Sequence, residues 1–332
     1  MKILLLFDVA CPVSPDVVYT GEMFLQEDKP AEANIFRSLQ QLGHEVQTMA
    51  VFDSVQDIVN RVTSFAPDLV FNQCESFRYD RALEPNIPAL LDLMKVPYTG
   101  SGQEGLLICK DKALAREVLS HHRVRAPRFL VSHLKSPLRR LQRFVYPAFV
   151  KPVGLDSSDG IAKASFVRDE KEAIDRLRFL HNKFNSDAMI EEYVDGREIY
   201  VSVLGTRRRQ VLPPREIFFG GMPDDEPKFA TSHAKWNEAY RKKWDISNGP
   251  AAPLPEEVDK ELRKIARNAY SWLRIRGFGR MDFRLSSKNE LFVIEANPNP
   301  ALGPEDDFAE SAKAAGLSYE QMVQEIVNAA LS

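Results

Sequence analysis

The residues best suited to chemistry lie in one short segment near the carboxyl end of the chain, residues 280–300. The segment predicts two strands joined by a two-residue turn at residues 288–289, where an Asn tolerates the left-handed conformation that hairpin turns need. With that turn, Asp282 and Glu295 lie opposite each other on one face, and Asn297 follows two residues later on the same face. Hard oxygen ligands of this kind suit magnesium or manganese.

A second candidate is a polar loop, residues 154–160, between two predicted strands. Its backbone N–H groups and the hydroxyls of Ser157 and Ser158 could bind phosphate oxygens, and a solvated hairpin turn is the alternative. Lys151 favours phosphate, because a lysine on an apolar strand is costly unless it meets an anion. Lys112, in the first turn of a predicted helix, is either a further phosphate ligand or a solvated helix charge.

Two further segments have both a functional and an unremarkable interpretation. In residues 191–198 an apolar strand gives way to acids and a glycine, which suits contact with a base and a ribose, or a strand end with solvated acids. Residues 219–253 carry prolines, glycines and charges without a sustained period, so we expect an unstructured insertion that acts as a lid. His233 and Lys235 lie inside it and either close over a phosphate or face solvent.

The other polar residues suggest no site. His44, His121, His122, His133 and His181 show no ligand spacing, so surface or packing roles are expected, and the arginines at 207–209 fit a solvated hairpin tip. The three cysteines are widely spaced and form no CxxC pair, so neither a disulfide framework nor a zinc site is indicated, and reduced thiols in the cytoplasm fit best.

Composition sets the frame for these candidates. A chain of 332 residues predicts two or three domains, and 44% hydrophobic residues allow a sizeable core. A net charge of -3 provides no basic field for nucleic acid. Asp8 ends the first apolar run, so the start of the chain predicts a strand rather than a signal peptide, and no membrane partner is expected.

The elements that must position the candidates change character near residue 100. Before it, strands and helices alternate as in an open α/β domain: strands over 2–7, 46–52 and 68–71, helices over 31–42, 55–65 and 86–94. After it, the order predicts an α+β arrangement of antiparallel sheets: helices over 111–121, 171–181, 256–275 and 319–331, strands over 128–131, 148–153, 161–167, 188–193 and 199–204, and the hairpin.

Five motifs in this order resemble the ATP-grasp ligases, and among them the D-alanine–D-alanine ligase family. They are Pro97-Tyr-Thr-Gly-Ser with Lys110-Asp-Lys, Val150-Lys-Pro, Ile190-Glu-Glu-Tyr-Val-Asp-Gly-Arg-Glu, Gly279-Arg-Met-Asp and Ile294-Glu-Ala-Asn. The resemblance covers nearly the whole chain. It implies an N-terminal α/β domain over residues 1–98 and an ATP-grasp fold of two α+β subdomains, residues 99–190 with the phosphate loop and 191–332 with the lid and metal site.

The resemblance also implies roles for individual residues. The nucleotide would be bound by Lys112, Lys151, Ser157, Ser158, Glu191, Val194, Glu198 and Ile294, with Glu191 and Val194 at adenine and Glu198 at the ribose. Two magnesium or manganese ions would be held by Asp282, Glu295 and Asn297. Arg280 would stabilise a tetrahedral intermediate, Lys235 would reach the terminal phosphate, and Ser158 would belong to the catalytic set.

The implied activity is ATP-dependent joining of a carboxylate and an amine through an acylphosphate, with small amino acids or amines as substrates and a homodimeric enzyme. The alternative is a non-catalytic ATP-binding protein on the same fold; a phosphotransferase is a more distant possibility. The chain departs from the family after strand one and again over residues 298–307, where the family's Ser-Leu carboxylate site is missing. There Asp306 and Asp307 predict an amine substrate that carries a positive group or lacks a free carboxylate.

Overall fold

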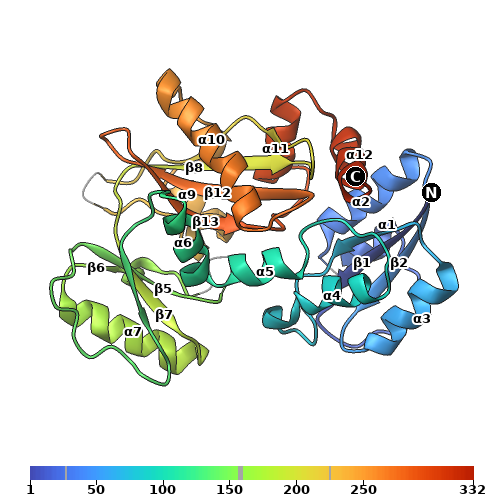
Figure 1. The fold of residues 1–332 in the computed structure, drawn as a ribbon, viewed down its shortest axis with the longest axis horizontal. Coiled ribbons are helices and arrows are strands. Elements are labelled where there is room, and N and C mark those ends of the chain that lie inside the picture. Colours follow the sequence, from blue (N-terminus) through green and yellow to red (C-terminus); the bar gives the residue numbers. More distant parts are fainter. Residues whose placement is uncertain (27, 156–159, 224–225) are drawn as a thin grey trace.

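The computed structural model describes residues 1–26, 28–155, 160–223 and 226–332, and the described residues form three sheets (Figure 1). The first is parallel, as predicted, and its strands run in the order β2-β1-β3. Its strands are β1 (Lys2–Asp8), β2 (Glu45–Val51) and β3 (Leu69–Gln73). The apolar run of β1 is buried on both faces because helices cover both sides. The helices of this region are α1 (Gly21–Gln26), α2 (Pro30–Gln41), α3 (Val55–Phe65) and α4 (Asn86–Leu93), with a 3-10 turn at Arg81–Leu83.

The end of the chain returns to this first sheet. Helices α11 (Asp307–Ala314) and α12 (Tyr319–Ala330) contribute Phe308, Met322 and Ile326 to the same hydrophobic core as Leu5 and Phe7. Figure 1 shows α12 beside α2, with both chain ends on this side of the molecule. The segment that follows the β12–β13 hairpin is therefore anchored against the N-terminal part.

The second sheet is antiparallel, in the order β4-β7-β5-β6. Its strands are β4 (Phe129–Ser132), β5 (Ala148–Pro152), β6 (Phe166–Val167) and β7 (Ala188–Glu192), and α7 (Glu170–Phe184) covers one face. Val150 and Ile190 point to α7, so the period of two turns Lys151 and Glu191 to the opposite face. Two helices, α5 (Gln103–Lys110) and α6 (Lys112–His121), connect this sheet to the first one.

The third sheet runs in the order β11-β10-β8-β12-β13, with β9 beside β8. Its strands are β8 (Arg197–Leu204), β9 (Gln210–Val211), β10 (Arg215–Phe219), β11 (Ile246–Pro250), β12 (Phe278–Leu285) and β13 (Leu291–Asn297). Helix α10 (Glu256–Trp272) packs on Ile199, Val201, Met281 and Phe283. Alternation therefore puts Glu198, Tyr200, Arg280 and Asp282 on the other face, and that polar face bears the candidate site.

The hairpin has the predicted pairing but not the predicted turn. Asp282 lies opposite Glu295 and Arg280 opposite Asn297, whereas Leu285 pairs with Leu291 across a longer connection. A two-residue turn at 288–289 is therefore wrong, although Asn289 does adopt a left-handed φ of 61°. The register shifts next to Asp282, and this bulge restores the alignment that a two-residue turn would have given.

Three other predictions of local structure are corrected. Helix α5 was not expected; it begins after Gly102 and packs against the Arg274 backbone at Gly105. The strand predicted over 161–167 is confined to β6 and is preceded by a 3-10 turn, Lys163–Ser165. Residues 219–253 are not an unstructured insertion, because they contain α8 (Ser232–Trp236), α9 (Glu238–Lys243) and β11. The side chains of Thr231 and Asn237 cap the N-termini of α8 and α9.

The three-part division at residues 98 and 190 stays a prediction. The boundary at 190 falls within β7, whose Glu191 and Glu192 still pair with β5. Among the described residues, no helix is long and apolar enough to cross a membrane.

Gly196 provides a test of the link between the second and third sheets. It has a φ of 138°, and a Cβ there would overlap the carbonyl oxygen of Leu285. We expect Gly196→Ala to lower the free energy of unfolding by about 2 kcal/mol or more. Gly21→Ala, at a position with no neighbouring atom within 4 Å, is the matched control. Chemical denaturation measures both, and equal stability of the two variants would contradict this account.

Candidate active site

Four side chains of the hairpin face form its polar centre. Arg280 donates to both Asp282 oxygens, from Nε at 2.7 Å and Nη2 at 2.9 Å. Asn297 Nδ2 also donates to Asp282, at 3.2 Å. Arg280 lies over the ring of Tyr200, the β8 residue paired with Asp282. Burial and the neighbouring Glu295 raise the pKa of Asp282. Arg280 lowers it, but the net effect is a raised pKa. The predicted grouping of Arg280, Asp282, Glu295 and Asn297 is therefore present.

Glu295 is the acid on which the cations converge. Lys112 Nζ lies 3.1 Å from Glu295 Oε1. Burial alone would raise the pKa of Glu295, but the ammonium groups of Lys112, Lys235 and Lys151 outweigh it and lower that pKa to about 2. Glu295 is thus an anion at all ordinary pH values. Lys112 is buried at the first turn of α6, so it is not the solvated helix charge of the alternative interpretation.

Lys151 lies in a buried ion-pair cluster on the second sheet. Its Nζ is 2.9 Å from Glu191 Oε1, and Arg116 contacts the other Glu191 oxygen while donating to the Ile294 carbonyl at 3.0 Å. Burial lowers the pKa of Lys151, and Glu191 opposes that effect. The cluster joins α6, β7 and β13 around one carboxylate, so Glu191 is not the solvated strand-end acid of the alternative interpretation.

Glu198 is also buried and paired. Tyr200 donates its hydroxyl to Glu198 Oε1 at 2.9 Å, and Arg284 Nη2 lies 3.1 Å from Oε2. Arg284 in turn donates to the carbonyls of Gly196 and Lys228, at 2.9 Å and 2.7 Å. These contacts connect the predicted ribose ligand to the predicted lid.

Two hollows meet at this face. The inner cavity lies between the second and third sheets and has both apolar and charged walls: Phe149, Lys151, Glu191, Val194, Glu198, Phe229, Lys235, Asp282, Ile294 and Glu295. The outer cleft, of about 600 Å³, is lined by the hairpin, the predicted lid, α5 and a loop of the first sheet. Lys235 and Glu295 line both hollows, and Arg280 and Asn297 line the outer cleft. A molecule in one hollow would therefore meet a molecule in the other beside the hairpin.

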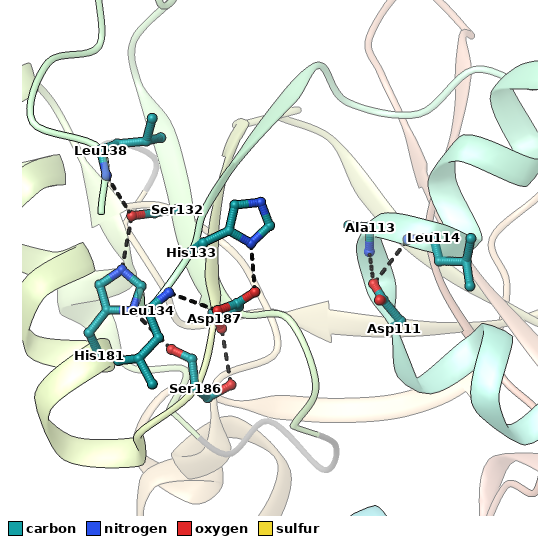
Figure 2. Close-up of polar contacts among 10 residues, drawn as sticks. All are labelled: Asp111, Ala113, Leu114, Ser132, His133, Leu134, Leu138, His181, Ser186 and Asp187. Carbon is teal, nitrogen blue, oxygen red and sulfur yellow. Dashed lines mark hydrogen bonds and ion pairs between the residues drawn. The ribbon is translucent and has the colours of Figure 1, made fainter. Parts of the chain in front are cut away.

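The N-terminus of α6 positions Lys112. Asp111 accepts from the N–H groups of Ala113 and Leu114 at 3.0 Å each, as Figure 2 shows at the right. We expect Asp111→Ala to cost about 1 kcal/mol of unfolding free energy, because two helix donors lose their acceptor. Urea denaturation measures it. The control is Asp175→Ala, an exposed residue within α7, and a loss no larger than that of the control would refute the capping role.

The histidines of the second sheet have structural contacts. His133 Nδ1 lies 2.7 Å from Asp187 Oδ2, and the buried His181 bridges Ser132 and the Ser186 carbonyl (Figure 2). Burial would raise the pKa of Asp187, but the Leu134 N–H and His133 hold it below its usual value. The predicted packing role is consistent with His181, while the His133–Asp187 pair was not anticipated.

The structure brings most predicted site residues to these two hollows and leaves two undescribed. Lys112, Lys151, Glu191, Val194, Glu198, Lys235, Asp282, Ile294 and Glu295 line them or contact residues that do. Ser157 and Ser158 lie outside the described residues. Arg116 and Arg284 were missed, although Arg116 is one helical turn after Lys112 and Arg284 is two residues after Asp282.

Asp306 and Asp307 both line the outer cleft, and each carboxylate accepts a hydrogen bond within the chain. Asp307 Oδ1 accepts from Arg215 Nε at 2.9 Å, and its Oδ2 accepts from Asn248 Nδ2 at 2.9 Å. Asp306 accepts from the Gly303 N–H at 2.7 Å, and burial raises its pKa. The charge of Asp307 is balanced by the buried guanidinium of Arg215, which weakens its repulsion of a carboxylate, and the expectation about the amine substrate stays a prediction.

The hairpin face has the donors that a divalent ion needs. Asp282 is buried and Glu295 is partly buried, each is neutralised here by a cation of the chain, and the Asn297 amide lies beside them. Among the described residues, no three His, Cys, Asp or Glu side chains cluster, so the ligand set rests on two carboxylates and one amide. Such oxygen donors fit magnesium or manganese better than zinc.

Three comparisons with known proteins bear on the family and the fold. Residues 118–328 match the family model described as "D-ala D-ala ligase C-terminus". A D-alanine–D-alanine ligase of Moorella thermoacetica is 30% identical over 89% of this chain and 91% of its own length. An uncharacterized protein of Sinorhizobium fredii is 26% identical over 90% of the chain and 86% of its own. The crystal structure of a D-alanine–D-alanine ligase from Bacillus anthracis complexed with ATP superposes with a TM-score of 0.74, at 19% identity, over 100% of this chain and 97% of that one, which confirms the predicted fold.

Proposed function

Because this chain belongs to the D-alanine–D-alanine ligase family, we propose that its two hollows bind ATP and an amino acid pair and that the hairpin face joins the pair. The chain is an ATP-dependent carboxylate–amine ligase that forms a C–N bond and releases ADP. Lys112, Lys151 and Lys235 converge on the hairpin carboxylate Glu295, where the inner cavity and the outer cleft meet. This convergence is the main support for the proposed site.

The chain's own residues have distinct tasks in this proposal. Lys151 and Lys112 neutralise nucleotide phosphates in the inner cavity, with Val194 and Ile294 against the base and Glu198 at the ribose. Lys235 faces the transferred phosphoryl group from the lid side. The carboxylate substrate attacks that group, the resulting acylphosphate is attacked by the amine, and Arg280 stabilises the negative charge on the tetrahedral intermediate.

Asp282, Glu295 and Asn297 would hold magnesium ions, for which we propose two sites. When bound, magnesium would neutralise charge on the phosphates and help align them for transfer. Arg280 and Lys112 now neutralise Asp282 and Glu295, so both cations would turn toward substrate and phosphate when the metal binds. Segment 219–253 would exclude water from the acylphosphate, with Lys235 on its inner side.

The decisive experiment is ADP release from ATP and magnesium against a panel of amino acids, singly and in pairs, with mass spectrometry of the products. We expect release only with pairs, and a product whose mass is the sum of the pair less one water. Tight ATP binding without turnover would instead support the non-catalytic alternative, which no contact among the described residues favours. Light scattering would test the homodimer that we also propose for a cytoplasmic enzyme.

A further inference from the structure

The outer cleft contains a guanidinium that is fixed in place by neutral acceptors. Arg241 of α9 donates from Nη1 to the Ala234 carbonyl at 2.6 Å and from Nη2 to Asn248 Oδ1 at 3.1 Å. Among the residues that the structure describes, none places a carboxylate in an ion pair with Arg241. The other guanidiniums of the cleft differ, since Arg280 pairs with Asp282 and Arg81 with Glu75. The positive charge of Arg241 is therefore held but not balanced.

A chain of polar contacts fixes the orientation of Arg241. Asn248 Nδ2 donates to Asp307 at 2.9 Å, which turns the amide oxygen of Asn248 toward Arg241. Asp307 is in turn held by Arg215 at 2.9 Å. Contacts that run from β11 through α11 to β10 thus fix the side chain of Arg241, which belongs to the predicted lid. A surface arginine with only a solvation role would need none of these contacts.

The location of Arg241 indicates which ligand it meets. Arg241 lines the outer cleft together with Arg280 and Asn297, and it does not line the inner cavity. Its partner is therefore not the nucleotide. A guanidinium has five N–H donors, and the two printed contacts leave others for a planar anion. Carboxylate is the planar anion that an arginine binds best by two parallel hydrogen bonds.

We propose that Arg241 is the residue that binds the non-reacting carboxylate of the acceptor amino acid. This inference rests on the proposed ligase function and deepens it. The carboxylate that is phosphorylated must lie at the hairpin face beside Arg280, so the anion at Arg241 belongs to the second substrate. Asp307, from which the sequence predicted repulsion of a carboxylate, instead serves to orient the group that attracts one.

The test compares acceptor amino acids with their carboxamides, which keep the amine and lose the charge. With wild-type enzyme, we expect the acid to have an acceptor KM about 10- to 100-fold below that of the carboxamide. Arg241→Gln should raise the acceptor KM of the acid by about the same factor and leave the carboxamide KM and the ATP KM within about 2-fold. Arg241→Lys should recover part of the preference. Lys242→Gln, on the same helix at an exposed position, is the matched control.

Two outcomes would overturn the inference: a wild-type enzyme that uses acid and carboxamide equally, or an Arg241→Gln variant that is slowed equally with both. Equal slowing would assign Arg241 a purely structural role through Ala234. If no pair released ADP, the proposed function would fail separately. Calorimetry with D-alanine and D-alaninamide, on protein loaded with magnesium and a non-hydrolysable ATP analogue, would then decide. Heat from D-alanine that Arg241→Gln abolishes supports the subsite; heat unchanged by the variant, or none with wild type, overturns it.

Discussion

Glu295→Gln is expected to lower kcat for ADP release by about 1,000-fold or more while the fold persists. The substitution keeps the size of the side chain and removes the carboxylate charge that Lys112, Lys151 and Lys235 stabilise. It would also replace the charged ligand that we propose for the metal by a neutral one. We therefore expect manganese affinity, measured by electron paramagnetic resonance on ATP-free protein, to fall together with the rate.

The control for this variant lies in the same hairpin. Glu290→Gln removes a carboxylate that pairs only loosely with Arg125, at 3.7 Å, and is exposed enough to be solvated. It should retain wild-type turnover and manganese binding. If Glu295→Gln released ADP at the wild-type rate, the assignment of the hairpin as the catalytic centre would be wrong.

Lys235→Met is expected to lower kcat by about 100-fold or more with little change in thermal stability. Among the described residues Lys235 forms no ion pair, yet it lines both hollows and lowers the pKa of Asp282 and Glu295 through its charge. Because Lys235 lines both hollows and forms no ion pair among the described residues, we expect its charge to bind a ligand and not to stabilise the fold. Its loss should therefore be catalytic, because the charge that develops on the transferred phosphoryl group loses a counter-ion.

Lys243→Met on the neighbouring helix is the comparison, because Lys243 lies over the Trp244 ring and lines neither hollow. It should leave kcat unchanged. Steady-state kinetics and thermal melts on both variants separate the possibilities. Equal kcat for Lys235→Met and wild type would mean that the lid side supplies no catalytic charge.

The sequence predicted which side chains share the hairpin face, because strand alternation is a strong local constraint. Asp282 and Asn297 share a face whatever the turn, once Asp282 and Glu295 are paired. The turn itself was predicted wrongly. The longer connection shifts the strand register, and the bulge next to Asp282 shifts it back, so Asp282 and Glu295 are paired as they would be with a two-residue turn. Neither effect leaves a periodic signal, whereas the left-handed Asn289 does follow from residue type.

Contacts between segments far apart in the sequence were not predictable from one chain. The balance of Asp307 by Arg215 joins positions 92 residues apart, so the sequence alone could not indicate that this acid has a cation partner. Helix α5 and the short helices of segment 219–253 were missed because no helical period stood out in these short runs, although the eight-residue α4 was predicted. Arg116 and Arg284 carried a usable signal, since both keep the spacing of a recognised site residue.

The central claim is that the carboxylate substrate is activated by phosphorylation at the hairpin face and then captured by the amine. Oxygen transfer tests it most directly. The enzyme is given ATP, magnesium and the amino acid pair that yields the fastest ADP release, with the donor carboxylate labelled with ¹⁸O, and the inorganic phosphate is analysed by ³¹P NMR. Our account predicts one ¹⁸O atom in each phosphate released. Amide product accompanied by unlabelled phosphate would contradict it.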